Sequence, residues 1–408
     1  MKLLFVADSR SPIALNWIAH FAHRSHEVHL VSMYPGHPDL HLASYHTIPV
    51  AFSGAVGESK SQDAGGIGAA KARLLRFLAP PRIRTWLRQR FIPLSLPKAA
   101  LQLRTLIHEL EPDLIHAMRV PYEGMLASLA LPDENGPPLL ISIWGNDFTL
   151  HAPSTQKMTA LTYHALKRAD ALHTDCYRDQ RLATAWGFNA KKPGVVIPGS
   201  GGVQLDLFYP KEEVLDPVVI NPRGLRAYVR NDTFFQAIPM VLSRHPQSRF
   251  VCPAMEGQPE AERWVKTLGL ESAVQLLPRQ PRKEMAALFQ NAQVVVSPST
   301  HDGTPNTLLE AMACGCFPVV GDIESLREWI TPGVNGLLVD PTDPKGLADA
   351  ICEGLQNPHL RARSKERNAH IIAERADYRR VMASAEAFYD TIMRSSTPTV
   401  CATPPTGK

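Results

Sequence analysis

The chain has 408 residues, of which 44% are hydrophobic and 20% are charged, and its formal charge is +4. This length allows two or three domains, each with a core of its own, and the composition is that of a globular, soluble protein. No run of about 18 apolar residues occurs, so we expect no membrane-spanning helix. The six cysteines form no CxxC pair, which disfavours a zinc site or a disulfide framework and favours a reducing cytoplasm.

The first predicted element is the apolar run at 3–6. It ends at Asp8 without a small-residue cleavage site, which favours a buried strand over a signal peptide. Similar short runs follow at 28–31, 114–116, 139–143, 171–174 and 195–198. Helical spacing appears between them at 13–24, 101–110 and 161–168. Strands that alternate with helices predict a parallel sheet of βαβ units.

A basic amphipathic segment at 71–104 interrupts this alternation. It contains no Asp or Glu, and its apolar side chains are interleaved with nine cations: Lys71, Arg73, Arg76, Arg82, Arg84, Arg88, Arg90, Lys98 and Arg104. Two interpretations stay open: a solvated helix face with ordinary core contacts, or a surface for an anionic membrane or an acidic acceptor. No nucleic-acid motif accompanies the segment, so nucleic acid is not an expected partner.

The alternation stops at 197–210, IPGSGGVQLDLFYP, and then begins again. Glycine and proline cluster there without periodicity, which predicts an inter-domain linker. Beyond it, strands are predicted at 218–220, 250–252, 274–277, 294–297, 318–320 and 337–339, and helices at 233–243, 260–268, 283–291, 307–313 and 347–355. We therefore predict two doubly wound, Rossmann-like α/β domains that face a central cleft, where ligands bind beyond the carboxyl ends of the strands.

The stretch at 297–322, SPSTHDGTPNTLLEAMACGCFPVVGD, places two acids around a helix start. Asp302 lies in the loop after a predicted buried strand, and Glu310 lies within the first turn or so of the following helix. The two acids are either ligand-binding groups, or a turn acid and a helix acid that compensates the helix dipole.

The helix start between these acids is a predicted anion site. Gly303 is expected to supply a backbone conformation closed to other residues, and Asn306 to cap the helix. The free N–H groups around Thr307 and Leu308 would hold an anion such as a diphosphate. Glu310, on the same side, would accept hydrogen bonds from a diol such as a ribose.

The segment DGTPNTLLEAMACGCFPVVGD resembles the E-x7-E signature of glycosyltransferase family four, whose members are retaining, nucleotide-sugar-dependent enzymes with the GT-B fold. The segments at 196–210 and 333–351 are also similar to this family, closely in the second half of the chain and loosely in the first. We therefore expect an N-terminal acceptor-side domain at 1–200 and a donor domain at 201–375. A helix at 376–393 is expected to cross back to the first domain, and 394–408 to be a disordered tail.

On the donor side, the resemblance implies that Glu310 holds the ribose hydroxyls and that Asp302 contacts the donor sugar. Family members carry a glutamate where this chain has Asp302, which is one methylene shorter. The other donor-facing residues that the resemblance implies are Gly303, Thr304, Asn306, Thr307 and Leu308.

Family members also place an arginine and a lysine after the first strand of the second domain, where both hold the diphosphate. Arg223 matches the arginine, and Arg226 stands in for the lysine. A guanidinium binds phosphate through two parallel hydrogen bonds, so the exchange is chemically acceptable. The alternative is a pair of surface arginines in a loop.

On the acceptor side, the resemblance implies that His116, in PDLIHAMRVPYEG, contacts the acceptor or the reaction centre. Met118 replaces the second histidine of the family's H-x-H, and a satisfied core histidine is the alternative at His116. Asp147, in SIWGNDF, is expected to line the acceptor side.

The expected reaction is transfer of a sugar, with retention, from a nucleotide diphosphate to a hydroxyl of a glycan or a lipid-linked acceptor. Two arginines and a helix N-terminus would stabilise the leaving diphosphate. No D-x-D pair occurs, so neither a metal nor another cofactor is expected. We expect a cytoplasmic enzyme, at the inner face of the membrane if 71–104 binds lipid. The alternatives are a sugar-nucleotide epimerase of the same fold and an inactive nucleotide-sugar-binding protein.

Overall fold

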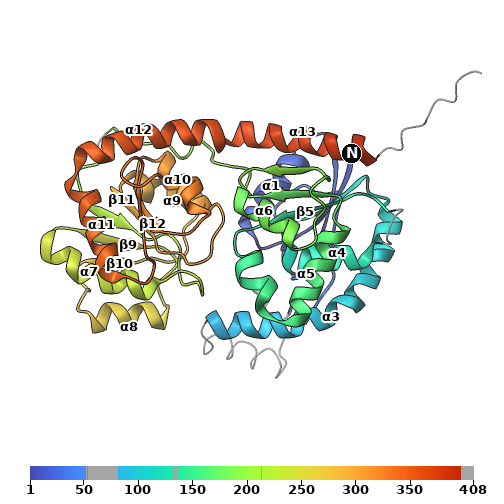
Figure 1. Ribbon diagram of the computed structural model, residues 1–408, viewed down its shortest axis with the longest axis horizontal. Coiled ribbons are helices and arrows are strands. Elements are labelled where there is room, and N and C mark those ends of the chain that lie inside the picture. Colours follow the sequence, from blue (N-terminus) through green and yellow to red (C-terminus); the bar gives the residue numbers. More distant parts are fainter. Residues whose placement is uncertain (52, 54–80, 132–135, 213, 397–408) are drawn as a thin grey trace, which may run out of the picture.

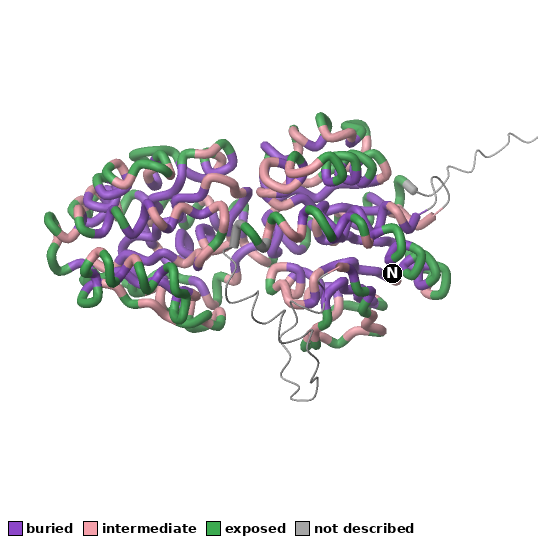
Figure 2. The backbone as a smooth tube through the Cα atoms, turned by 90° about the horizontal axis from the view of Figure 1, so that it is seen from below, coloured by how far each residue is buried: buried purple, intermediate pink, exposed green. Residues whose placement is uncertain are grey.

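The computed structural model describes residues 1–51, 53, 81–131, 136–212 and 214–396. The predicted cations at 71–76 and most of the predicted tail lie outside these residues. The chain folds into two α/β domains, each built on a parallel sheet flanked by helices (Figure 1). Buried backbone runs through the middle of both domains, and exposed segments lie at their periphery (Figure 2).

The first sheet has seven parallel strands in the order β3-β2-β1-β4-β5-β6-β7. Its strands are β1 (Lys2–Val6), β2 (Glu27–Ser32), β3 (Ser44–Thr47), β4 (Leu114–Ala117), β5 (Leu139–Ile143), β6 (Ala171–Thr174) and β7 (Gly194–Val196). Its helices are α1 (Pro12–Ala22), α3 (Pro81–Leu110), α4 (Met125–Ala130), α5 (Gln156–Arg168) and α6 (Tyr177–Ala185), with short helical turns η1 (Val120–Gly124), η2 (Asp147–His151) and η3 (Ala152–Ser154).

The second sheet has six parallel strands in the order β10-β9-β8-β11-β12-β13. Its strands are β8 (Val218–Ile220), β9 (Arg249–Cys252), β10 (Val274–Leu276), β11 (Val294–Ser297), β12 (Phe317–Gly321) and β13 (Leu337–Val339). Its helices are α7 (Asn231–Arg244), α8 (Pro259–Thr267), α9 (Arg282–Gln290), α10 (Asn306–Ala313), α11 (Pro344–Gln356) and α12 (Pro358–Arg375), with the turn η4 (Leu326–Glu328).

The order of the strands fixes where each domain can hold a ligand. In the first sheet the direction of winding reverses between β1 and β4, and in the second it reverses between β8 and β11. Parallel α/β sheets bind ligands at such switch points, outside the carboxyl ends of the strands. The loops after β1, β4, β8 and β11 are therefore the segments that position a site.

The last helix, α13 (Tyr378–Ser396), packs on the first domain although it follows the second in sequence (Figure 1). Tyr389 is fully buried and stacks on Phe21, with ring centroids 4.5 Å apart. The Trp17 Nε1–H donates to the Tyr389 hydroxyl over 3.0 Å. Next to this crossing, the linker backbone pairs with the start of α13, since the Val203 N–H donates to the Ala376 carbonyl over 2.7 Å.

The helix α3 buries one face in the first domain and leaves apolar side chains on the other. Its buried face includes Ile92, Leu96 and Leu103 in the same core as α4. Its outer face exposes Ile83, Trp86, Phe91, Leu94 and Leu101, which are between 41% and 67% accessible. Within the described part of the chain, none of the helices is both long enough and apolar enough to cross a membrane.

Candidate functional site

Arg223 lies at the centre of the second domain's switch point. The loop after β8 carries it toward the loop after β11, where its Nη2 donates to Asp302 Oδ2 over 2.7 Å. Its Nη1 donates to the hydroxyl of Thr307, in the first turn of α10, over 3.3 Å. Both side chains of the Arg223–Asp302 pair are largely buried. The structure thus brings together three residues that the sequence predicts to face the donor.

Arg226 does not join this cluster through its side chain. It is exposed, and its Nε donates to the backbone carbonyl of Arg223 over 3.0 Å. Its guanidinium therefore braces the loop that carries Arg223 in this conformation.

Glu310 is largely buried in α10 and pairs with Arg282 at the start of α9, with Nη2 and Oε1 3.4 Å apart. Burial raises the pKa of Glu310 to about 7, and the nearby Arg282 guanidinium opposes this rise. Arg282 also donates to Asn16 of the first domain over 3.1 Å and to Gln204 of the linker over 3.3 Å. It therefore ties the donor helix to both the first domain and the linker.

Arg282 is absent from the sequence prediction, although the sequence holds a signal for it. Helices favour acids in the first turn, because the dipole there is positive. Here the first two residues of α9 are Arg282 and Lys283. Glu284 in the same turn follows the usual preference, so the signal consists of Arg282 and Lys283 alone.

The prediction for Gly303 is right about the need for glycine and wrong about the cause. Gly303 is not among the residues with a positive φ. Instead, the first domain approaches its backbone closely: a Cβ on Gly303 would lie 2.2 Å from Asp175 Oδ1, and one on Gly145 would lie 1.5 Å from the Gly303 nitrogen. The two glycines together allow the domains to meet at the edge of the donor loop.

The predicted N-cap at Asn306 is also wrong. The helix α10 begins at Asn306, so Pro305 occupies the cap position and offers no side-chain bond. Asn306 Oδ1 instead accepts from the Ser200 hydroxyl of the linker over 2.7 Å. This contact fixes the helix start against the linker.

Fewer residues are available to an anion at the predicted site than the sequence indicates. The Leu308 N–H donates to the Pro305 carbonyl over 2.9 Å, and the Leu308 side chain is buried in the core. The Thr304 hydroxyl donates to the Asp175 carbonyl and accepts from Trp329 Nε1 over 2.9 Å. Leu308 and Thr304 thus support the loop, and the side chains that remain toward the switch point are Arg223 and Thr307.

Contacts from the first domain hold the Asp302 backbone. Arg178, at the start of α6, donates to the Asp302 carbonyl over 2.7 Å and to the Gly145 carbonyl over 2.6 Å. Glu328 of the second domain accepts from the Tyr177 and Arg178 N–H groups at the start of α6, each over 2.9 Å. The domains therefore meet through a dense set of hydrogen bonds on one side of the donor loop.

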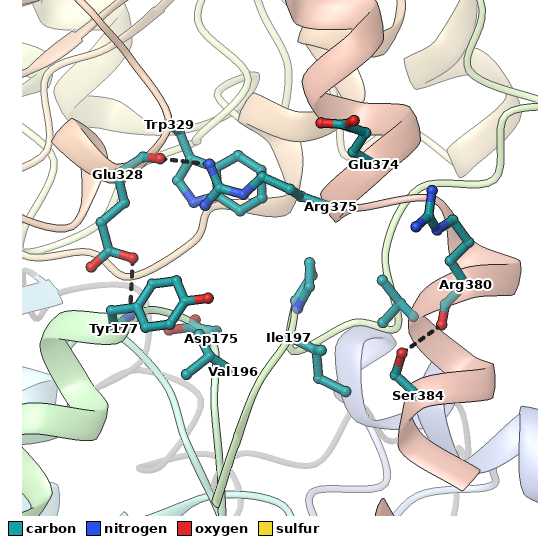
Figure 3. A pocket seen from close by; sticks show the side chains of 12 residues that line it. Asp175, Tyr177, Val196, Ile197, Glu328, Trp329, Glu374, Arg375, Arg380 and Ser384 are labelled. Carbon is teal, nitrogen blue, oxygen red and sulfur yellow. Dashed lines mark hydrogen bonds between the residues drawn. The ribbon is translucent and has the colours of Figure 1, made fainter. Parts of the chain in front are cut away.

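A pocket of about 220 Å³ lies beside this contact (Figure 3). Figure 3 shows Arg375 against the face of Trp329, a contact of 4.1 Å to the ring centroid. The walls of this pocket come from the segments that follow β6 and β7, from η4, and from the end of α12 and the start of α13, where the chain crosses back to the first domain. The residues predicted to face the donor do not line it, so this pocket is separate from the predicted donor site.

His116 lies in the core of the first domain and not in the cleft, which corrects the prediction. It is 1% accessible, with Nδ1 2.5 Å from the Tyr389 hydroxyl and Nε2 2.7 Å from the Ser142 hydroxyl. Burial lowers its pKa well below the usual value. Both ring nitrogens are occupied, so His116 fixes α13 to the sheet as a neutral side chain.

Asp147 is buried one layer behind the acceptor side. It accepts from Arg119 Nε over 2.7 Å and from the Trp144 N–H over 3.0 Å. Arg119 follows β4 and lines a cavity at the first domain's switch point. Asp147 therefore positions an arginine that can face an acceptor.

This switch-point cavity has a volume of about 140 Å³, and sequence reasoning missed most of its wall. Its lining residues follow β1, β4 and β5 or lie on α3: Asp8, Ser11, Ala14, Arg88, Met118, Arg119, Pro121, Tyr122, Glu123 and Trp144. Met118 is the predicted replacement for the family's histidine, and it does reach this wall. Tyr122 has φ of 74°, in the left-handed region that is unfavourable for a tyrosine.

Comparison with known proteins agrees with this architecture. Residues 211–370 match the family model described as glycosyl transferases group 1, and residues 2–175 match the model described as glycosyl transferase 4-like. Together the two models account for most of the chain and include both switch points.

Two relatives illustrate the range of similar sequences. The chain is 33% identical over 142 residues to the D-inositol 3-phosphate glycosyltransferase of Frankia alni, which covers 32% of this chain and about a third (35%) of that protein. It is 25% identical over 255 residues to the GDP-mannose:cellobiosyl-diphosphopolyprenol alpha-mannosyltransferase of Xanthomonas campestris, which covers 59% of this chain and 63% of that protein.

Solved structures extend the similarity over the whole fold. Sucrose-phosphate synthase from Thermosynechococcus elongatus superposes with a TM-score of 0.73 at 16% identity, covering 97% of this chain and 100% of that one. HepE of Anabaena, in complex with UDP-glucose, superposes with a TM-score of 0.70 at 17% identity, covering 96% of this chain and 100% of that one. At this identity the superposition shows the fold alone, with its two facing domains.

Proposed function

Because this chain belongs to the group 1 glycosyltransferases and has the GT-B fold, we propose that it transfers a sugar from a nucleotide diphosphate to an acceptor hydroxyl, with retention and without a metal. The observation that carries this proposal is the position of Arg223. At the switch point of the donor domain, it contacts both Asp302 and Thr307 at the start of α10. A diphosphate that replaces these contacts would meet a guanidinium and a helix N-terminus together.

The chemistry follows from the charges around Arg223. Cleavage of the anomeric C–O bond places negative charge on the diphosphate, and preorganised donors in a dry site stabilise that charge as it develops. Arg223 is largely buried, so its interaction with a phosphate is little screened. Once released from Arg223, Asp302 would accept hydrogen bonds from the sugar. Once released from Arg282, Glu310 would accept them from the ribose.

The donor base and sugar are open within this proposal. Titration of the protein with UDP, GDP and ADP, and with their sugars, tests the donor site by calorimetry and by release of nucleotide. Binding with slow release of free sugar and no epimer supports a transferase. Formation of an epimer would favour an epimerase, and binding without any turnover across acceptors would favour an inactive binding protein.

For the acceptor, we propose a lipid-linked molecule at an anionic membrane surface, on the cytoplasmic side that the sequence predicts. The outer face of α3 supports this proposal, because it combines exposed Trp86, Leu94 and Leu101 with exposed Arg90 and Lys98. An amphipathic helix of this kind inserts its apolar side chains between lipids while its cations meet anionic headgroups, at about 1 kcal/mol per cation. Arg88, which the sequence groups with these cations, points into the first domain instead, because it donates to Tyr34.

Vesicle sedimentation tests the membrane proposal. We expect the protein to sediment with anionic vesicles and to stay in solution with neutral ones. Leu94→Glu should lower the bound fraction severalfold, since it places a charge on the inserting face. Leu215→Glu, at an exposed leucine of the second domain, is the matched control and should bind like the wild type. Equal and negligible binding to both kinds of vesicle would contradict the proposal and favour a soluble acceptor.

A further inference from the structure

The cavity at the first domain's switch point contains polar groups without partners. Among the described residues, eleven side chains carry a buried nitrogen or oxygen without a hydrogen bond, and four of these line this one cavity. The four atoms are Arg88 Nε, Tyr122 Oη, Glu123 Oε2 and Trp144 Nε1. Buried polar atoms in proteins are nearly always bonded. Trp144 Nε1 lies beside Gly199 of the linker, so a ligand in this cavity would supply partners to the atoms of Arg88, Tyr122 and Glu123.

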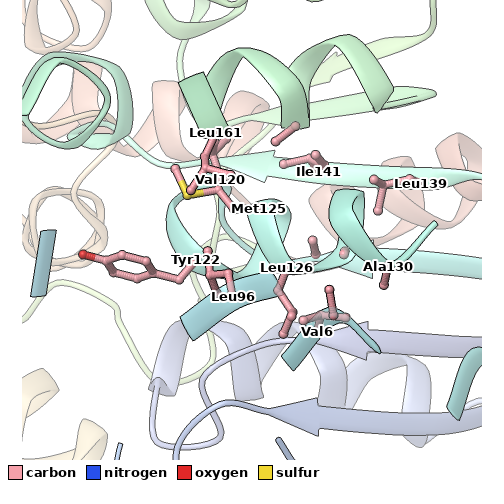
Figure 4. Close-up of a cluster of buried hydrophobic side chains, with 14 of the residues drawn as sticks. Val6, Leu96, Val120, Tyr122, Met125, Leu126, Ala130, Leu139, Ile141 and Leu161 are labelled. Carbon is pink, nitrogen blue, oxygen red and sulfur yellow. The ribbon is translucent and has the colours of Figure 1, made fainter. Parts of the chain in front are cut away.

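The two most buried of these side chains are held in the cavity wall by their backbone. Tyr122 and Glu123 are 4% and 6% accessible, and both lie in η1, directly after β4. Figure 4 shows Tyr122 directed away from the core side chains Leu96, Val120 and Met125. Tyr122 nevertheless belongs to the same buried core as these side chains, so its left-handed backbone accompanies a ring at the boundary between this core and the cavity.

The charges of this wall do not balance. Asp8 is bound by Arg10 through two hydrogen bonds of 2.8 and 2.9 Å, and Asp147 neutralises Arg119. Arg88 donates to the Tyr34 hydroxyl over 2.8 Å and lies 5.6 Å from the ring centroids of Tyr34 and Tyr122. Within the described part of the chain, no carboxylate forms an ion pair with Arg88.

Glu123 is the acid on the same wall, and it does not supply the missing charge at neutral pH. Burial raises its pKa to about 8, with Asp8 adding to the rise and Arg119 and Arg88 opposing it. A carboxyl of this kind is mostly protonated at pH 7, so it offers one donor and one acceptor to a hydroxyl. Arg88 is therefore a largely buried cation without an acid partner among the described residues, and it lies near the neutral Glu123 carboxyl, which can both donate to and accept from a hydroxyl.

We propose that this cavity binds the acceptor and that Arg88 binds a phosphate group on it, while Glu123 bonds a hydroxyl of the same molecule. The proposal rests on the proposed transferase function and names the substrate class of its acceptor site. Arg88 Nη2 already donates to Tyr34, but its Nε–H has no partner in the described part of the chain, so a phosphate oxygen can accept from Nε while the guanidinium charge attracts the group. The phosphate belongs either to a soluble sugar phosphate or to a lipid phosphate. A lipid phosphate would be consistent with the membrane proposal above, because Arg88 lies on α3, the helix whose outer face carries the exposed apolar side chains.

Phosphate binding by the nucleotide-saturated protein tests the site. Saturation with the nucleoside diphosphate that binds best occupies Arg223, so inorganic phosphate then reports on the cavity of the first domain. We expect phosphate to bind to the wild type, and Arg88→Gln to weaken it at least tenfold. Arg88→Lys keeps the charge without the planar fork and should fall between them. Lys157→Gln, at an exposed cation on α5, is the control and should bind phosphate like the wild type.

Two outcomes would overturn the proposal: no phosphate binding by the nucleotide-saturated wild type, or equal binding by wild type and Arg88→Gln. A near-UV circular dichroism spectrum and a thermal unfolding curve like those of the wild type show that the first domain of each variant is intact, and unchanged nucleotide binding shows the same for the second. If the wild type binds no nucleotide at all, the proposed function fails; if it binds nucleotide but no phosphate, this inference fails alone.

Competition identifies the source of the phosphate. Glucose 1-phosphate that displaces inorganic phosphate, with glucose as the control, supports a soluble acceptor of the proposed class. Displacement by vesicles that contain phosphatidic acid, and not by vesicles of phosphatidylcholine, supports a lipid phosphate. Displacement by neither would overturn the assignment of this anion site to an acceptor.

Discussion

The two switch points differ in how their charges are balanced. In the second domain, Arg223 is paired with Asp302 at 2.7 Å and Arg282 with Glu310 at 3.4 Å. In the first domain, Arg88 has no acid partner among the described residues and Glu123 Oε2 has no bond. Both arginines of the second domain's edge are thus paired with acids, although Arg223 Nε is itself buried without a hydrogen bond to any residue that the structure describes. Within the same described residues, the first domain's edge leaves Arg88 without an acid, and this is where we propose that an acceptor phosphate binds.

The largest expected effect is that of Arg223→Gln. If Arg223 stabilises the leaving diphosphate, its loss should lower kcat by roughly 10²- to 10³-fold, because the charge that it meets grows as the bond breaks. Nucleotide affinity should fall less than turnover. Arg244→Gln, at an exposed arginine paired with Asp349 on the far side of the domain, is the control. A kcat within twofold of the wild type would place Arg223 outside the reaction.

Arg226→Ala tests the second predicted arginine, and its loss of turnover is to be compared with that of Arg223→Gln. Arg226 is exposed and reaches the backbone carbonyl of Arg223, so we expect a smaller loss of turnover, roughly tenfold, by loosening of the loop. A loss as large as that of Arg223→Gln would mean that Arg226 turns inward and contacts the diphosphate itself.

Glu310→Gln should weaken the bare nucleotide and the nucleotide sugar alike, by roughly tenfold, since a ribose contact is common to both. The pKa of Glu310 is raised to about 7 by burial, so the carboxylate that accepts from the ribose forms mainly above that pH. Nucleotide affinity of the wild type should therefore increase between pH 6 and pH 8 by more than that of the Gln variant, in which only the terminal phosphate of the nucleotide, with a second pKa of about 6, still titrates. Calorimetry at several pH values measures both, and parallel profiles would exclude a ribose contact.

Asp302→Asn separates the sugar from the nucleotide. We expect binding of the bare nucleotide not to weaken, because Asp302 pairs with Arg223 and competes with the diphosphate for it. Turnover should fall by roughly tenfold, because the side chain is assigned to the sugar. If Asp302→Asn and Glu310→Gln both leave binding and turnover unchanged, the two acids are ordinary carboxylates near a helix start.

The smallest expected effect is on stability and comes from Glu123→Gln. The folded protein holds this carboxyl protonated up to about pH 8, whereas in the unfolded chain it ionises near pH 4.3. The folded state therefore binds more protons between these values, so the wild type loses stability as the pH rises through this window. The Gln variant lacks this loss, and its free energy of unfolding should gain at least about 1 kcal/mol on the wild type between pH 5 and pH 8. Equal pH profiles in urea denaturation would show that Glu123 is solvated.

The sequence predicted the elements that carry a strong local pattern. The valine run of β11 and the glycine-rich linker were both visible, because a buried parallel strand is continuously apolar and a linker lacks periodicity. The strand β3 was missed: its residues, SYHT, are polar and only partly buried at the sheet edge, so no apolar run marks it. The elements that were predicted correctly carry a local sequence pattern. Strand β3 forms because it pairs with β2, and that pairing leaves no pattern in its own sequence.

The site was predicted at the level of positions and less well at the level of contacts. Arg223, Asp302 and Thr307 do meet, because the two loops that carry them flank one switch point. Gly303 is required by Gly145, which lies far away in the sequence, and no local reasoning supplies that cause. The positions of Arg88 and Glu123 in the cavity of the first domain were not predicted for the same reason, since the absence of an ion pair can be recognised only from the residues around them in the structure.

The helix α13 has a consequence for biosynthesis. Tyr389 completes a core that also holds Trp17 and Phe21, so the first domain is discontinuous: its opening strands leave the ribosome long before its last helix does. The second domain is synthesised in between and can fold as a unit on its own. We therefore expect the first domain to complete its fold after the second. The apolar face formed by Trp17 and Phe21 would stay uncovered until α13 has been translated.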